Sequence, residues 1–123
     1  MAQILVLDDE PNNRLLLGTI LEFGGYEFVE ASNAADALRA ARARRPDLVI
    51  MDLHMPGMSG ADFLKELRAD PALSRVKVAL YTATSCDDDL RQFMEVAGIE
   101  HIIPKPSDPS EVLRIVGAIV SAG

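Results

Sequence analysis

Cysteine and tryptophan are nearly absent from this sequence. Its 123 residues include one cysteine, Cys86, and no tryptophan, and aromatic residues make up 5% of the chain. A single cysteine excludes an internal disulfide, which is typical of proteins in a reducing compartment. A chain of this length can bury a hydrophobic core without disulfides or structural metals, so we expect a single domain.

Long hydrophobic runs and an excess of basic residues are also missing. No apolar stretch approaches the roughly 20 residues that span a bilayer, and the N-terminal segment MAQILVLDDE lacks the basic start of a signal peptide. The formal net charge is −7 and the pI is near 4.7, whereas nucleic acids and anionic membranes attract basic faces. We expect a cytoplasmic protein that neither inserts into a membrane nor binds nucleic acid.

Five short apolar runs alternate with five segments of helical periodicity. The runs cover residues 3–7, 26–31, 47–51, 76–81 and 99–103. Helical spacing indicates that the first helix buries Leu16, Ile20 and Phe23, and the second Ala34, Ala37, Leu38 and Ala41. This alternation predicts an α/β fold, in which helices cover both faces of a parallel sheet.

Charged residues in the runs predict the order of the strands. The first, third and fourth runs are almost wholly apolar, whereas the second and fifth carry Glu27, Glu30, Glu100 and His101. Charge is tolerated best on edge strands. The strand order 2-1-3-4-5 places both charged runs at the edges, and it is the order of flavodoxin-like, doubly wound (βα)5 sheets.

Polar side chains stand where the apolar runs end. Asp8 and Asp9 follow the first run, Asp52 follows the third, Thr82 follows the fourth and Lys105 follows the fifth. Parallel strands end at one edge of the sheet, so the three carboxylates should meet there, with Thr82 and Lys105 approaching from the other side. Close carboxylates repel one another, and Mg²⁺ relieves that repulsion. The set is equipped for phosphoryl transfer, with Asp52 as the candidate nucleophile.

These residues resemble the receiver domain of two-component response regulators, and the resemblance covers essentially the whole chain. It is carried by Asp8 and Asp9 after ILVL, Asp52 in DLHMPGMSG, Thr82 in YTA and Lys105 in PKP. The resemblance implies that Asp52 accepts a phosphoryl group from a histidine kinase or a histidine phosphotransfer protein. It also implies that Thr82 moves to bond the phosphoryl oxygen, and that Lys105 pairs with Asp52 or the phosphoryl group.

A Mg²⁺ site follows from the same resemblance. The implied ligands are Asp9, Asp52 and the backbone carbonyl of His54, with Asp8 assisting through water. Such a domain is not an enzyme, apart from catalysing its own phosphorylation and dephosphorylation. Phosphorylation is implied to switch the face formed by the fourth helix, the fifth strand and the fifth helix.

One position departs from the family. The family often has tyrosine or phenylalanine three residues before the lysine, where it rotates together with the threonine, and this chain has Ile102 there, preceded by His101. Tyr81 is no simple replacement, because it adjoins Thr82 and neighbouring residues of a strand point to opposite faces. The resemblance therefore does not extend to the aromatic readout.

The resemblance implies that residues 1–123 form one receiver domain without an output domain. A homodimer through the fourth and fifth helices is left open. The ending PKPSDPSEVLRIV is similar to receivers of multidomain sensor kinases. A fragment of such a kinase is therefore the main alternative to a stand-alone receiver.

Two alternatives come from other classes of protein. A flavin carrier with this strand order needs a Ser-, Thr- or Gly-rich loop after the first strand, and the loop here is DDEPNN, whose charge repels phosphate. A metal-dependent phosphohydrolase that forms an aspartyl-phosphate would use the same acids. Such enzymes usually need a cap that selects the substrate, and this chain has no spare length for one.

Overall fold

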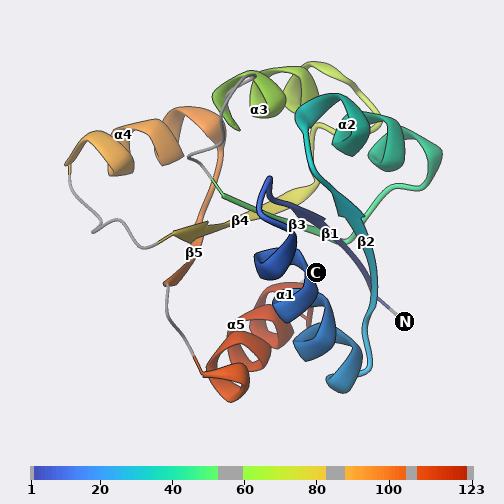
Figure 1. The fold of residues 1–123 in the computed structure, drawn as a ribbon. Helices are drawn as coiled ribbons and strands as arrows, with labels where there is room; N and C mark the ends of the chain where they lie inside the picture. The colour runs from blue at the N-terminus through green and yellow to red at the C-terminus, as the bar shows by residue number, and fades with distance from the viewer. Residues whose placement is uncertain (1, 53–59, 83–87, 105–107, 122–123) are drawn as a thin grey trace.

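The structure, a computed structural model, describes residues 2–52, 60–82, 88–104 and 108–121. Within these ranges five strands alternate with five helices along the chain (Figure 1). The strands are β1 Gln3–Leu7, β2 Glu27–Ala31, β3 Leu48–Met51, β4 Lys77–Thr82 and β5 His101–Pro104. The helices are α1 Pro11–Phe23, α2 Ala34–Ala43, α3 Gly60–Ala69, α4 Asp88–Ala97 and α5 Pro109–Ser121. None of these described helices is long and apolar enough to cross a membrane.

The strands form one parallel sheet in the order β2-β1-β3-β4-β5, which confirms the predicted order and fold class. The three central strands are buried along almost their whole length, whereas β2 and β5 contain exposed residues. Their charged side chains can therefore stay in contact with water. In the central register, Leu7 of β1 pairs with Met51 of β3, and Met51 pairs with Leu80 of β4.

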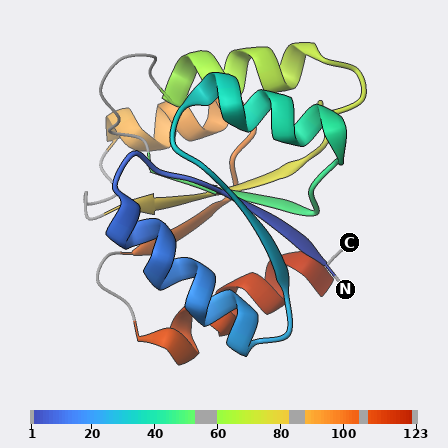
Figure 2. The same cartoon turned by 45° about the vertical axis from the view of Figure 1, so that its right-hand side comes forward.

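Helices cover both faces of the sheet, with α1 and α5 on one face and α2, α3 and α4 on the other (Figures 1 and 2). The alternation of side chains along each strand builds a separate core on each face. In β1, Leu5 and Leu7 pack on the side of α2, α3 and α4, whereas Ile4 and Val6 pack on the side of α1 and α5. The predicted buried face of α2 is confirmed at Ala34, Ala37, Leu38 and Ala41.

The predicted buried face of α1 is wrong at two positions. Leu16 is 51% exposed and Phe23 is 88% exposed. The helix instead buries Leu17, Gly18, Ile20 and Leu21. A Cβ atom on Gly18 would lie 2.3 Å from Cζ of Phe28 in β2, so the missing side chain makes room for that ring. This close approach determines which face of α1 meets the sheet, and the run Leu15–Leu17 cannot reveal it.

Arg68 joins three segments at the amino end of β4 and β5. Its guanidinium donates hydrogen bonds to the carbonyls of Ala97 (3.0 Å) and Gly98 (3.2 Å), at the end of α4. It also donates to the carbonyls of Ser74 (3.0 Å) and Val76 (2.6 Å), just before β4. Burial lowers the pKa of Arg68 from its usual value. A cation here also balances the negative end of the α4 dipole.

Candidate functional site

Asp8 and Asp52 lie next to each other where β1 and β3 end. Because Leu7 pairs with Met51, the following residues of the two strands are neighbours. Two backbone hydrogen bonds continue the ladders past the strand ends, from Asp8 N to Ala31 O (3.1 Å) and from Asp52 N to Leu7 O (3.2 Å). The parallel sheet therefore brings together two acids that are 44 residues apart in the sequence.

The three carboxylates differ in their contact with water. Asp8 is 1% exposed, and its Oδ1 accepts a hydrogen bond from Glu10 N (2.9 Å). Asp52 is half-buried and Asp9 is exposed. Burial disfavours the charged form of a carboxyl group unless a cation or hydrogen bonds compensate. An opposite charge nearby would compensate the buried Asp8, whereas the exposed Asp9 stays in contact with solvent.

Thr82 ends β4 and is 3% exposed. It pairs with Pro104, the last residue of β5, so the candidate hydroxyl stands at the same edge of the sheet as Asp52. The predicted residues Lys105 and His54 lie outside the described residues. Ile102 pairs with Leu80 and packs partly buried against the core on the side of α2, α3 and α4. Tyr81 belongs to the opposite core, as the alternation along the strand predicts.

The oxygen donors at this edge fit a small, hard cation. Mg²⁺ binds through one or two carboxylates and keeps waters or phosphate oxygens at its other positions. Asp8 is a buried carboxylate beside a half-buried one, and such a pair gains most from a divalent charge. In the described part of the chain, no group of three or more His, Cys, Asp or Glu side chains is arranged to hold a metal by itself. Magnesium would therefore need further ligands, such as water or a backbone carbonyl.

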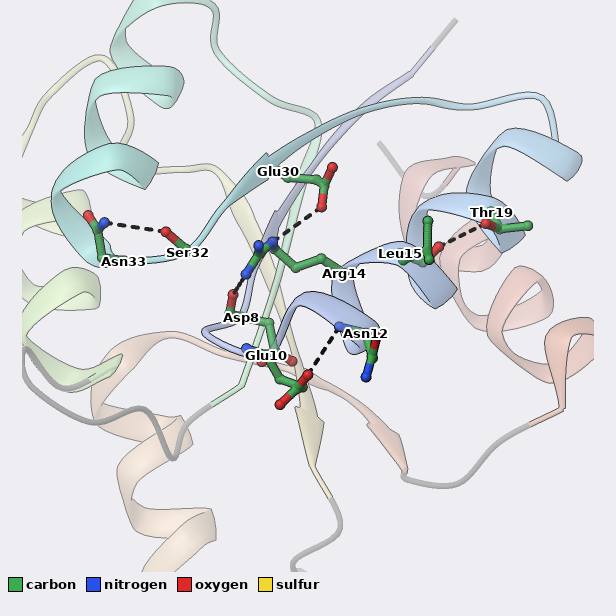
Figure 3. A network of polar contacts seen from close by, with 9 residues as sticks. All are labelled: Asp8, Glu10, Asn12, Arg14, Leu15, Thr19, Glu30, Ser32 and Asn33. Atoms are coloured by element: carbon green, nitrogen blue, oxygen red, sulfur yellow. Dashed lines mark hydrogen bonds and ion pairs between the residues drawn. The ribbon is translucent and has the colours of Figure 1, made fainter.

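Arg14 and Glu30 complete the surroundings of the acidic turn, and the sequence pattern did not indicate either for the site. Arg14 donates a hydrogen bond from Nη1 to the carbonyl of Asp8 (2.7 Å), and its Nε forms an ion pair with Glu30 Oε1 (3.2 Å) (Figure 3). Glu30 is two residues beyond Phe28 on β2, and Arg14 is one helical turn before Gly18. No local signal in the sequence indicates the pair, because it depends on how α1 is rotated against β2.

The start of α1 is fixed by local hydrogen bonds as well. Glu10 is the N-cap, and its Oε1 accepts a hydrogen bond from Asn12 N (3.2 Å). Pro11 occupies the first turn, where its missing N–H has no intrahelical acceptor to lose. Helix α1 therefore begins within two residues of Asp9, and its geometry is coupled directly to the acidic turn.

Comparison with known proteins identifies the family. The family model described as the response regulator receiver domain matches residues 4–117 of this chain. The chain is 31% identical to protein PilH of Pseudomonas aeruginosa over 121 residues, which are 98% of this chain and 99% of PilH. It is 36% identical to the DNA-binding response regulator MtrA of Mycobacterium tuberculosis over 116 residues, which are 94% of this chain and 49% of MtrA. The chain thus spans nearly all of PilH and about half of MtrA.

Solved structures agree with this family. The chemotaxis protein CheY4 of Vibrio cholerae superimposes with a TM-score of 0.91 at 27% identity, covering 97% of this chain and 98% of CheY4. The receiver domain of sensor histidine kinase PA1611 from Pseudomonas aeruginosa superimposes with a TM-score of 0.86 at 28% identity, covering 98% of both chains. That structure has a magnesium ion coordinated in its active site cleft. The present chain therefore belongs to the response regulator receiver domains, the signalling domains of two-component systems.

Proposed function

We propose that Asp52 accepts a phosphoryl group from a phosphohistidine on a histidine kinase or a histidine phosphotransfer protein. The observation that carries this proposal is the hydrogen bond from Asp52 N to Leu7 O, which holds Asp52 beside the buried Asp8. A half-buried carboxylate at a strand end is open to a donor, yet the backbone fixes its position. Receiver domains interact with histidine kinases, which supplies the class of donor.

The reaction is a displacement at phosphorus. A carboxylate oxygen of Asp52 forms a bond to phosphorus while the P–N bond to the donor imidazole breaks, and the electron pair of that bond passes to the imidazole nitrogen. The product is an acyl phosphate on Asp52, and the donor leaves as a neutral histidine because the other nitrogen of its phosphorylated imidazole carries a proton. In this kind of transfer, positioning and charge neutralisation supply most of the catalysis. The domain is then not an enzyme in the usual sense, because the acceptor is its own side chain.

The acids around Asp52 would hold Mg²⁺. Asp9 and Asp52 are the proposed carboxylate ligands, the carbonyl of His54 is a third ligand, and Asp8 acts through water. Bound magnesium would neutralise phosphoryl oxygens as they approach the carboxylates. Lys105 is proposed to pair with the phosphoryl group from the opposite side. The buried position of Asp8 and the exposed position of Asp9 support this division.

Thr82 is proposed to carry the signal away from the site. Its hydroxyl would bond the phosphoryl oxygen, and the movement would alter the face formed by α4, β5 and α5. Ile102 pairs with Leu80 in that region. Its aliphatic side chain has no polar group that could form a hydrogen bond when Thr82 moves. We therefore propose that repacking of an aliphatic side chain replaces an aromatic switch here.

Several expectations about the whole protein stay predictions. These are a receiver unit of residues 1–123 without an output domain, the alternative of a sensor-kinase fragment, a homodimer through α4 and α5, and a cytoplasmic location. The absence of nucleic-acid binding is a prediction too, since MtrA is a DNA-binding regulator of which this chain spans about half. The family favours neither the flavin carrier nor the phosphohydrolase.

Nuclear magnetic resonance with a phosphoryl analogue tests the proposed site. Beryllofluoride with Mg²⁺ should shift the amide signals of Thr82 and α4 in the parent protein and should leave Asp52→Ala unchanged. Asp36→Asn is a matched control, because it removes one charge from the exposed surface of α2. It should respond as the parent does. An Asp52→Ala variant that responds like the parent would rule out Asp52 as the acceptor.

A further inference from the structure

Arg14 of α1 reaches back over the acidic turn to the edge of the sheet. We infer that Arg14 is a positioning residue, which holds the turn at Asp8 and Asp9 in the shape that binds a divalent cation. This inference rests on the function proposed for the site. It adds to the proposed ligands a residue that touches neither the cation nor the phosphoryl group.

The contacts of Arg14 join three elements. Its Nη1 donates to the carbonyl of Asp8 (2.7 Å), at the end of β1, and its Nε pairs with Glu30 Oε1 (3.2 Å), on β2. The side chain of Arg14 is 16% exposed, whereas that of Glu30 is 46% exposed. A largely buried side chain with two oriented acceptors has little freedom, and hydrogen bonds from a charged donor are stronger than those between neutral groups.

The accepting carbonyl determines what Arg14 can control. This carbonyl belongs to the peptide bond that joins Asp8 to Asp9, so its direction sets the path of the chain into Asp9. The side chain of Asp8 is fixed separately, because its Oδ1 accepts a hydrogen bond from Glu10 N (2.9 Å). Figure 3 shows Arg14 between Glu30 and the Asp8 carbonyl, with Glu10 and Asn12 on the other side of the turn. Arg14 therefore acts on Asp9 through the backbone.

A positioning role and a purely electrostatic role predict opposite results. A fixed positive charge near three carboxylates repels an incoming cation, so removal of the charge alone would tighten Mg²⁺ binding. Loss of a group that orients the ligands would weaken binding, since such outer partners contribute about tenfold or more to metal affinity. The direction of the change in affinity therefore separates the two roles.

The test compares Arg14→Gln, Arg14→Lys and Glu30→Gln with the parent protein. Arg14→Lys keeps the charge but cannot donate to both acceptors from a rigid fork. We expect both Arg14 variants to bind Mg²⁺ about tenfold more weakly and Glu30→Gln to show a smaller loss, because Arg14 then keeps the Asp8 carbonyl. Calorimetry with Mg²⁺ alone measures the affinity. Hydrogen exchange of the Asp9 and Glu10 amides in metal-free protein should be faster in the Arg14 variants.

Arg42→Gln is the matched control, because Arg42 Nε forms a comparable ion pair with Asp70 Oδ2 (3.2 Å) away from the acidic turn. It should bind Mg²⁺ as the parent does, and urea unfolding should show that all variants are folded. Equal or tighter Mg²⁺ binding by Arg14→Gln, or unchanged amide exchange, would overturn the inference alone. A parent protein that fails to bind Mg²⁺ would overturn the proposed metal site, and the inference with it.

Discussion

At the carboxyl end of the sheet, the buried carboxylate of Asp8 lies beside Asp52, whereas at the amino end the guanidinium of Arg68 donates to four backbone carbonyls. The first end gathers carboxylates, and a divalent cation would place an opposite charge beside them. The second end places a cation of the chain itself against the negative end of a helix. The same sheet thus has one end where an arginine is hydrogen-bonded to backbone carbonyls and one end where acids are gathered.

This difference assigns separate tasks to the two ends. Buried groups that satisfy one another contribute to the stability of the folded state, since breaking them leaves partners without hydrogen bonds. Like charges held together lower stability but create affinity for an opposite charge, as is common at functional sites. We expect substitutions at the amino end to change stability and substitutions at the carboxyl end to change binding.

Arg68→Ala should produce the largest effect and leave the site intact. It removes hydrogen bonds to Ser74, Val76, Ala97 and Gly98, so we expect the free energy of unfolding to fall by about 3 kcal/mol, since one hydrogen bond to a charged group contributes about 1.5–3 kcal/mol. Urea unfolding followed by circular dichroism measures the loss. Arg75→Ala is the control, because Arg75 is exposed in the same connection. Impaired Mg²⁺ binding by folded Arg68→Ala would show that the two ends are coupled.

Asp9→Asn should produce the converse result. Asp9 is exposed, so its substitution costs little packing. We expect Mg²⁺ binding to weaken about tenfold, while the free energy of unfolding without Mg²⁺ stays the same or rises because one repulsive charge is gone. Calorimetry and urea unfolding of the same sample provide both values. A large loss of stability without any loss of affinity would reverse the assignment of tasks.

Phe23→Ala should produce the smallest effect. It tests whether the end of α1 that is far from the acidic turn contacts a protein donor of the phosphoryl group. Phe23 is 88% exposed at the far end of α1, and Leu15 and Leu16 on the same helix are 67% and 51% exposed. Exposed apolar side chains favour contact with another protein. If they contact the phosphohistidine protein, we expect slower phosphoryl transfer from that donor and an unchanged rate from acetyl phosphate, which needs no docking surface. Val96→Ala on α4, where Val96 is 86% exposed, is the matched control. Equal slowing with both donors would argue against a docking role for α1.

The order of the strands and the positions of the acids could be predicted because local signals carry them. Apolar runs mark buried strands, and Asp8 and Asp52 end two runs that must be neighbours once the charged runs are at the edges. Parallel pairing then fixes which edge of the sheet they share. The position of Ile102 beside β4 follows from the same pairing.

The face of α1 and the contacts of Arg14 could not be predicted in this way. Three consecutive leucines, Leu15–Leu17, give no preferred face, and the choice depends on Phe28 of β2 meeting Gly18 of α1 on one face of the sheet. The pair of Arg14 with Glu30 depends on the same rotation of the helix. Both are tertiary contacts between residues far apart in the sequence, and no local pattern marks them as partners. The residues that support the site are therefore harder to find than the acids that form it.

Mapping of the modified residue tests the central claim most directly. The parent protein is treated with acetyl phosphate and Mg²⁺, the acyl phosphate is reduced with borohydride, and the digested peptides are sequenced by mass spectrometry. We predict that the reduced residue is Asp52 and that its yield falls to background without Mg²⁺. Modification at Asp8 or Asp9 with Asp52 unchanged, or equal labelling of Asp52 without Mg²⁺, would contradict the proposed site.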